Sequence, residues 1–234
     1  MTAAAPWKGF FIAGTDTAVG KTLVAVSLTR ALVARGLRVA VMKPVAAGTV
    51  ETADGSRNED ALELLAASNV PAAYEDVNPW LLATPASPHL AARYAGVSIR
   101  HEPIVAAQRR LSANADLLLV EGAGGWHAPI SAIETMGDVA EKLALPVILV
   151  VGLRLGCLNH ALLTREAIRS QSLPFAGWIA NRMAVEMPLA EANIETLASR
   201  FGVSPLATVP SGSPGAGGTP PAWAREVADR LVSH

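Results

Sequence analysis

Cysteine is almost absent from this chain, and its scarcity excludes two kinds of site. With Cys157 alone, neither an internal disulfide nor a zinc site built from several cysteines is possible. Cys157 has no neighbouring base in the sequence, so we expect a small buried residue rather than a nucleophile. The 5 histidines, His89 and His127 included, show no metal-binding spacing, and we assign none of them a catalytic role.

The chain also lacks an excess of charge of one sign and a long apolar run. Its formal net charge is −1, which predicts neither a nucleic acid partner nor an anionic membrane partner. The longest apolar segment, Leu143 to Leu153, is interrupted by Pro146 and Gly152 and falls well short of the ~20 residues that span a bilayer. Because the stretch MTAAAPWKGFF has no secretory layout, we expect a cytoplasmic protein.

What the chain does contain is a regular alternation of short apolar runs and segments with helical spacing. The expected strands are Gly9–Gly14, Leu37–Val45, Asp116–Glu121, Pro146–Gly152, Phe175–Asn181 and Pro205–Val209. The expected helices are Lys21–Ala34, Glu59–Ala67, Glu102–Ala113, Thr135–Leu143, Leu158–Ser170, Leu189–Phe201 and Ala222–Val232. The alternation predicts an α/β fold, with one doubly wound domain over residues 1–234 and a mainly parallel sheet. The stretch Ser211 to Trp223 is rich in Gly and Pro and is expected to form a loop at the rim.

The stretch GTDTAVGKT, Gly14 to Thr22, follows the first expected strand and precedes the first expected helix. It ends in Gly-Lys-Thr like the phosphate-binding loop of P-loop NTPases, but it has one residue more than the standard loop. Backbone amides at the helix start and the Lys21 ammonium would both face an anion, and the Thr22 hydroxyl would bind magnesium. The sequence therefore predicts a P-loop NTPase-like nucleotide site.

Two carboxylates are placed to complete such a site. Glu121 ends an apolar strand, so its side chain is expected at the carboxyl edge of the sheet, where it could hold magnesium. Asp60 falls in the first turn of a helix, where a carboxylate also favours the helix dipole. The sequence alone leaves Asp60 open between a helix cap and a ligand.

Lys43 closes the second expected strand, and Pro44 holds it extended. Its ammonium is expected at the same edge of the sheet as that of Lys21. Two lysines on one anion would neutralise the charge that spreads over a phosphoryl group during its transfer.

Taken together, the motifs give a chain that resembles the dethiobiotin synthetase family. The matching pieces, in the family's order between residues 14 and 181, are GTDTAVGKT, KPVAAG, RNEDAL, VNPW, SPHLAA, VEGAGGW, LPVILVVG, LGCLNHALLT and GWIAN. The resemblance implies an ATP- and Mg2+-dependent ligase that carboxylates diaminononanoate with carbon dioxide. A carbamate would attack the γ-phosphate, and the second amine would then close the ureido ring and expel phosphate. Such a reaction needs alignment and charge neutralisation but no protein nucleophile.

The resemblance also assigns site residues. It implies that Lys43 and Lys21 are catalytic and that Thr22, Asp60 and Glu121 surround magnesium. Nucleotide contacts are implied for Gly14, Thr15, Asp16, Thr17, Ala18, Val19, Gly20, Lys21, Thr22, Asp60, Glu121, Gly122, Ala123, Gly124, Asn181 and Pro210. Substrate contacts are implied for Thr17, Lys43, Ala47, Gly156, Cys157, Leu158 and Asn159. Many relatives carry Glu in place of Ala18 and Ser or Thr in place of Ala47, so those side-chain contacts are lost here.

The segment LGCLNHALLT implies a homodimer with shared sites. Gly156 permits a tight turn, and Cys157, Leu158 and Asn159 open a helix whose free amides suit a carboxylate. In the family this helix start receives the carboxylate of a substrate whose amines lie in the other subunit. The alternative is that Asn159 merely caps its own helix.

Two other functions share parts of this sequence pattern. ATPase switches that position partners on membranes or DNA have a related loop, but they usually carry a lysine early in it, where this chain has Thr15 and Asp16. Amide-forming ligases of cobalamin synthesis carry an added glutamine-hydrolysing domain, for which this chain has neither the length nor a suitable cysteine.

Overall fold

A computed structural model describes residues 8–183, 187–213 and 218–232 of the chain. Its strands are β1 (Gly9–Gly14), β2 (Val39–Met42), β3 (Val45–Ala47), β4 (Val50–Thr52), β5 (Gly55–Arg57), β6 (Trp80–Leu82), β7 (Leu117–Glu121), β8 (Val147–Leu153), β9 (Phe175–Arg182) and β10 (Ala207–Val209). Its helices are α1 (Lys21–Val33), α2 (Glu59–Ala67), α3 (Tyr74–Val77), α4 (Pro88–Tyr94), α5 (His101–Ala113), α6 (Met136–Leu143), α7 (Cys157–Ser170), α8 (Ala190–Phe201) and α9 (Ala222–Val232).

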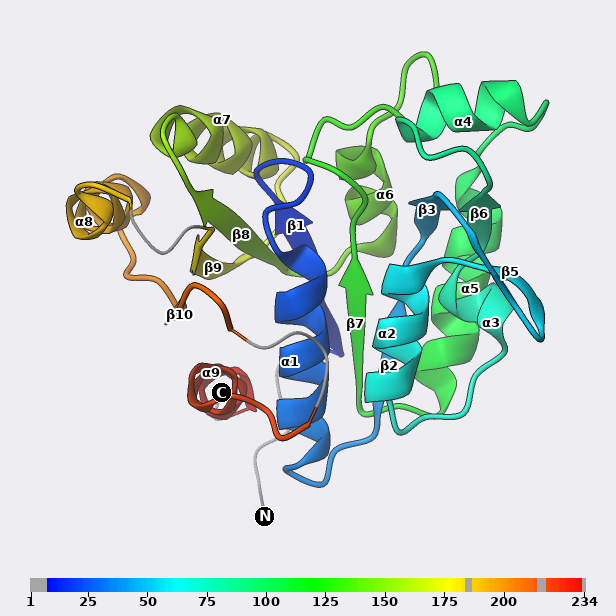
Figure 1. Cartoon of the computed structure of the whole chain (residues 1–234), viewed down its shortest axis with the longest axis horizontal. Helices are drawn as coiled ribbons and strands as arrows, with labels where there is room; N and C mark the ends of the chain where they lie inside the picture. The colour runs from blue at the N-terminus through cyan, green and yellow to red at the C-terminus, as the bar shows by residue number, and fades with distance from the viewer. Residues whose placement is uncertain (1–7, 184–186, 214–217, 233–234) are drawn as a thin grey trace.

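The centre of the fold is a parallel 6-stranded sheet in the order β10-β9-β8-β1-β7-β2. Strands β1, β7 and β8 are buried along their whole length, as their sequences require, because these are apolar except for Glu121 at the end of β7. Helix α1 packs with α2 and α9, while right-handed crossovers place α5, α6, α7 and α8 on the opposite face (Figure 1). The predicted doubly wound, mainly parallel architecture is confirmed.

The functional edge of the sheet is the one at the carboxyl ends of its strands. The loop between β1 and α1 lies at this edge, at the upper end of β1 in Figure 1. Strand order reverses around β1, because the chain moves toward β2 on one side and from β8 to β9 and β10 on the other. Ligands of open α/β sheets bind outside the strand ends at such a switch point.

The prediction of one strand over Leu37–Val45 is wrong. The apolar run splits into β2 and β3, and Lys43 and Pro44 lie between them. Proline has no N–H for a sheet ladder, and after it the chain leaves the large sheet to pair with β6 in a 2-stranded sheet. The strand β6, the small antiparallel pair β4–β5 and the helices α3 and α4 were also not predicted.

Most other boundaries agree with the predictions within two residues, and β1, α2 and α9 match them. The predicted rim loop starts after β10, but its residues 214–217 lie outside the described part of the chain.

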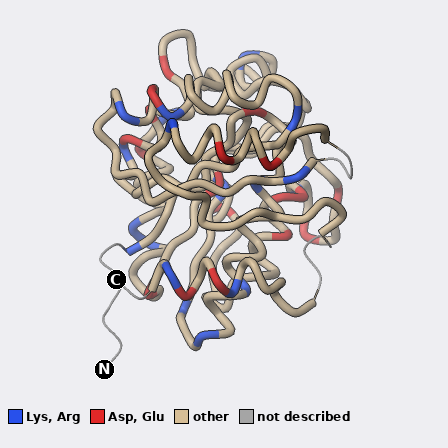
Figure 2. Tube along the Cα trace, turned by 90° about the vertical axis from the view of Figure 1, so that its left-hand side faces the viewer, with Lys and Arg blue, Asp and Glu red and all other residues tan. Residues whose placement is uncertain are grey.

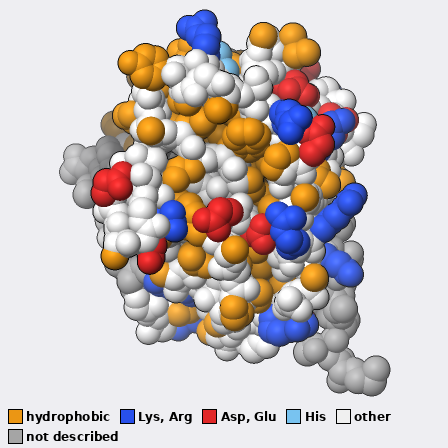
Figure 3. All heavy atoms as spheres, turned by 90° about the vertical axis from the view of Figure 1, so that its right-hand side faces the viewer, with side chains coloured by type: hydrophobic (Ala, Val, Ile, Leu, Met, Phe, Trp, Pro, Cys, Tyr) orange, Lys and Arg blue, Asp and Glu red, His pale blue; other side chains and the backbone are white. Residues whose placement is uncertain are grey.

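The surface agrees with the near-neutral charge. Basic and acidic residues are scattered over the trace in Figure 2, and on the face shown in Figure 3 both signs are interspersed with apolar side chains. Among the described residues, no helix is long and apolar enough to cross a membrane.

Candidate active site

The loop from Thr15 to Gly20 turns the chain from β1 into α1. Gly20 is the N-cap of α1 with φ of 91°, in the left-handed region that favours glycine, and no side chain caps this helix start. A Cβ at Gly20 would lie 2.2 Å from the amide nitrogen of Asn181, so the position also has no room for a side chain. The helix thus begins with open backbone amides, which suit a phosphate.

Lys21 opens α1 and is buried, with 6% of its surface exposed. Its Nζ donates a hydrogen bond of 2.9 Å to the backbone carbonyl of Asp16. Burial, followed by repulsion from Lys43, lowers the pKa of Lys21 to about 8. The Asp16 carboxylate accepts a hydrogen bond of 2.7 Å from the amide of Thr17 and pairs with Arg154. Burial therefore disfavours the charged form of Lys21, and a bound phosphate would stabilise it.

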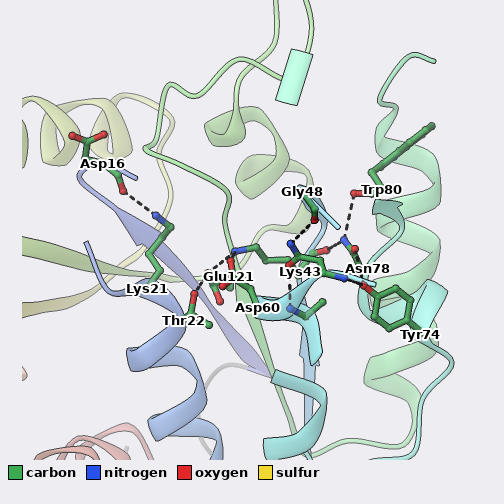
Figure 4. A network of polar contacts seen from close by, with 12 residues as sticks. Asp16, Lys21, Thr22, Lys43, Gly48, Asp60, Tyr74, Asn78, Trp80 and Glu121 are labelled. Carbon is green, nitrogen blue, oxygen red and sulfur yellow. Dashed lines mark hydrogen bonds and ion pairs between the residues drawn. The ribbon is translucent and has the colours of Figure 1, made fainter. Parts of the chain in front are cut away.

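Lys43 lies directly after β2 and is buried, as is Glu121 at the end of β7. Strands β2 and β7 are neighbours, with Met42 paired to Val120, and this register brings the two side chains together. The Lys43 Nζ donates to Glu121 Oε1 at 2.5 Å and to Asp60 Oδ2 at 2.8 Å (Figure 4). The predicted convergence of these groups at one edge is confirmed.

Charge pairing dominates over desolvation in this cluster. Burial disfavours the ammonium of Lys43, but Glu121 and Asp60 outweigh it and raise the pKa of Lys43. Burial likewise disfavours the Asp60 carboxylate, but Lys43 outweighs it and lowers the pKa of Asp60. Thr22 donates its hydroxyl to Glu121 Oε1 at 2.9 Å. The second carboxylate oxygen of Glu121, Oε2, is buried and has no hydrogen-bond partner among the described residues.

These groups face a cavity of about 650 Å³ at the carboxyl edge of the sheet. Its charged and hydroxyl side is formed by Thr17, Lys21, Thr22, Lys43, Asp60, Ser87 and Glu121, and its remaining lining by Ala18, Gly20, Ala46, Ala47, Asn58, Pro85, Ala86, Pro88, Ala123, Gly124 and Ala128. No site role was predicted for Ala46, Asn58, Ala128 or residues 85–88. The signal for the last of these was present, because Ser87-Pro88 marks a helix start in the motif SPHLAA.

Of the predicted site residues, Gly14, Thr15, Asp16, Val19 and Gly122 do not line this cavity, and neither do two further groups. Asn181 is buried at the end of β9, and its Nδ2 donates to the backbone carbonyl of Val19 at 2.8 Å. Pro210 follows β10 and lines a separate hollow with Trp223 and Glu226. Val209 pairs with Asn181, so the two predicted nucleotide contacts stand at neighbouring strand ends.

The second group outside the cavity is the start of α7, which begins at Cys157 rather than at Leu158. Gly156 is its N-cap with φ of 92°, so the predicted tight turn is confirmed. No side chain caps α7, and the alternative that Asn159 does so is therefore wrong. Cys157 is buried, as expected, while Leu155 just before it is 99% exposed.

Comparisons with known proteins agree with this geometry. A family described as an AAA domain matches residues 8–214. The chain is 50% identical over 203 residues to the ATP-dependent dethiobiotin synthetase BioD of Cellvibrio japonicus, covering 87% of this chain and 89% of that protein. It is 47% identical over 201 residues to the protein of the same name from Xanthomonas oryzae pv. oryzae, covering 86% and 90%.

Solved structures share the fold at low sequence identity. The MinC:MinD cell division complex of Aquifex aeolicus superposes with a TM-score of 0.62 at 19% identity, covering 97% of this chain and 96% of that one. MinD of Pyrococcus horikoshii, complexed with Mg-ADP, gives a TM-score of 0.58 at 15% identity, covering 96% and 95%. At such low identities the similarity shows a P-loop NTPase fold. It gives no support for a function in positioning protein partners.

Proposed function

The chain belongs to the family of ATP-dependent dethiobiotin synthetases, and from this premise we propose that its cavity carries out ureido ring closure on diaminononanoate. One amine would take up carbon dioxide as a carbamate, and a carbamate oxygen would attack the γ-phosphate of ATP to release ADP. The second amine would attack the carbonyl of the resulting mixed anhydride, close the ring and expel phosphate. The observation that supports this site best is the convergence of Lys21, Lys43 and Glu121 on one cavity.

The two lysines have different tasks in this proposal. Lys21 would leave the carbonyl of Asp16 and bind the phosphates, because a phosphate oxygen is a far stronger acceptor for an ammonium than a backbone carbonyl. Lys43 is held in place by two carboxylates and would stabilise the carbamate and the transferring phosphoryl group. The hydroxyl of Thr17 would meet the diamine, and Ala47 would line its site without a polar side-chain contact.

Thr22, Asp60 and Glu121 fit a magnesium ion. Hydroxyl and carboxylate oxygens are its preferred ligands, and the unpartnered Oε2 of Glu121 is a buried oxygen ready for a cation or its water. Bound there, the ion would neutralise charge on the β- and γ-phosphates. MinD of Pyrococcus horikoshii, which shares the fold, is a complex with Mg-ADP.

For the nucleotide we propose that the backbone of residues 14–20 and of Gly122, Ala123 and Gly124 surrounds the phosphates, and that Asn181 and Pro210 contact the base. The amide nitrogen of Asn181 already donates to Val19. Its carbonyl oxygen is therefore the group that would accept from the adenine N6 amine.

We further propose a homodimer in which the start of α7 holds the carboxylate tail of a substrate bound in the other subunit. The amide of Cys157 donates to the carbonyl of Arg154 at 3.0 Å, but no side chain caps the next two amides, those of Leu158 and Asn159, and these support this role. Residues 1–234 would act as a single carboxylase domain. Its location in the cytoplasm stays a prediction from the sequence.

The decisive experiment supplies the protein with ATP, magnesium, bicarbonate and diaminononanoate and analyses the product by mass spectrometry. We expect a cyclic urea with ADP and phosphate in equal amounts. Lys43→Ala should lower turnover by about 100-fold or more without unfolding the protein. ATP hydrolysis that ignores the diamine would contradict the proposal and favour an ATPase switch instead.

A further inference from the structure

The motif VNPW contains a buried asparagine that the proposed reaction does not use. Asn78 is 3% exposed and follows the short helix α3. Its Nδ2 donates to the backbone carbonyl of Lys43 at 2.7 Å and reaches the carbonyl of Trp80 at 3.4 Å (Figure 4). A buried amide with this partner acts on the main chain that carries the Lys43 side chain.

The main chain of Lys43 has no sheet partner on this side, because β2 ends at Met42 and β3 begins only at Val45. Its two polar groups are held instead by two consecutive residues. The Lys43 amide donates to the carbonyl of Val77 at 2.7 Å, and its carbonyl accepts from Asn78. Buried backbone groups need such partners, and here they fix the point from which the lysine side chain extends.

Asn78 is also linked by hydrogen bonds to the helix that carries Asp60, one of the two carboxylate partners of Lys43. The Tyr74 hydroxyl donates to Asn78 Oδ1 at 3.3 Å and accepts from the backbone amide of Asn58 at 2.7 Å. Asn58 caps α2 through a hydrogen bond of 3.2 Å from the amide of Ala61. Asp60 lies in the first turn of α2, and its carboxylate forms a salt bridge with Lys43, so the hydrogen-bonded path leads back to the lysine.

We propose that Asn78 is a positioning residue that sets the place of the Lys43 ammonium between Glu121 and Asp60. The hydrogen bond from Asn78 fixes the backbone of Lys43, and the path through Tyr74 fixes the helix that carries Asp60. Burial raises the pKa of Tyr74, so its hydroxyl keeps the proton that it donates. This inference rests on the proposed role of Lys43, for which a displacement near 1 Å costs about 100-fold in rate.

The test uses two variants and a matched control. Asn78→Leu keeps the number and branching of the side-chain heavy atoms but removes the hydrogen bonds, while Tyr74→Phe keeps the ring under Arg57 and removes the hydroxyl alone. Asn69→Leu is the control: Asn69 brackets the opposite end of β2, with its amide 2.9 Å from both the Val39 nitrogen and the Leu37 carbonyl. It lies away from the cavity and should lose stability only.

Turnover is the first measurement. For Asn78→Leu we expect kcat to fall by about 100-fold while KM for ATP changes by less than about threefold, because the lysine acts in the transition state. Tyr74→Phe should show a smaller fall in kcat of the same kind, and Asn69→Leu none. A kcat of Asn78→Leu equal to that of the unmodified protein would overturn the proposal, since packing alone would then explain the residue.

A direct measurement of Lys43 makes the test independent of activity. The lysines of the chain are Lys8, Lys21, Lys43 and Lys142, so lysine-selective 15N labelling gives few ammonium signals, and Lys43→Ala assigns the one required. We expect the Lys43 ammonium signal to shift and broaden in Asn78→Leu and Tyr74→Phe and to keep its position and width in Asn69→Leu. An unchanged signal in both variants would refute the positioning role.

These outcomes separate two failures. Full turnover by Lys43→Ala would contradict the proposed function, yet the Lys43 signal would still show whether Asn78 holds the lysine. If Asn78→Leu does not fold, the signal of Tyr74→Phe decides the question, because that variant removes the hydroxyl that holds the Asn78 amide, and an unchanged signal there would refute the positioning role.

Discussion

Replacing Lys21 by methionine should make the ligand-free protein more stable while destroying its use of ATP. Lys21 is 6% exposed, and in the ligand-free protein its ammonium has lost water without gaining a full counter-charge. Burial and the neighbouring Lys43 lower its pKa, and Glu121, Asp60 and Asp16 compensate only in part. Methionine has a similar length and no charge, so it would fill the same space without this penalty.

The size of the effect follows from the pKa of Lys21. A fall from 10.5 to about 8 corresponds to about 3 kcal/mol of destabilisation at neutral pH, at roughly 1.4 kcal/mol per pKa unit. Methionine also loses the hydrogen bond to the carbonyl of Asp16, which contributes about 1 kcal/mol. Lys21→Met should therefore gain about 2 kcal/mol, or about 5 °C in the unfolding temperature of a chain of this size.

The pH dependence identifies the cause. Because the folded pKa of Lys21 lies below its unfolded value, the penalty is fully present below pH 8 and disappears between about pH 8 and pH 10.5. The difference in unfolding free energy between Lys21→Met and the unmodified protein should shrink by about 2 kcal/mol from pH 7 to pH 9.5. Urea unfolding in EDTA at a series of pH values measures it. Lys142→Met, at an exposed lysine, is the control and should stay within about 0.5 kcal/mol throughout.

A second arm of the same assay adds ATP and magnesium. The unmodified protein should gain about 3 kcal/mol at a concentration of 100 times the dissociation constant, and Lys21→Met should gain little. A Lys21→Met variant less stable than the unmodified protein at pH 7 would contradict this prediction. So would a difference in unfolding free energy between the two proteins that did not change with pH.

Three further experiments, with four substitutions and one control, test other parts of the site. Gly20→Ala places a Cβ against Asn181 at a residue with φ of 91° and should raise KM for ATP by about tenfold or more, while Gly36→Ala, also at positive φ but in open space, should not. Asp60→Asn and Glu121→Gln should raise the magnesium concentration needed for half-maximal rate by about tenfold, and an unchanged requirement would remove them as ligands. Gly156→Asp should repel the substrate carboxylate and raise KM for the diamine but not for ATP. A fully active monomer in light scattering would contradict the shared site.

The central sheet and the charged cluster could be predicted because both follow from local sequence. Strands such as β1 and β7 are continuous apolar runs, and a parallel sheet brings their ends to one edge whatever the loops do. This is why Glu121 and Lys43 were placed together without coordinates. The same reasoning failed at Pro44, where an apolar run was taken for one strand although the proline marks a change of sheet.

The parts that could not be predicted depend on contacts between distant residues. Asn78 has the sequence context of an ordinary turn, and its role appears only when its amide is seen against the carbonyl of Lys43. Pro85 belongs to a loop without periodicity and Pro88 opens the short helix α4, so the place of both beside the cavity is set by packing. Asn181 was predicted at a strand end, but its bond to Val19 depends on the shape of the loop after β1.

The ion pair between Asp16 and Arg154 joins the phosphate-binding loop to the turn before α7. In the proposed dimer that helix holds the tail of the partner's substrate, so nucleotide in one site and diamine in the other would be thermodynamically linked. The pair is half-exposed, and such pairs contribute up to about 1 kcal/mol, which limits the coupling to about fivefold. Reciprocity requires that diamine tighten or weaken ATP binding in the opposite subunit by the same factor, and Arg154→Ala would make the two sites independent.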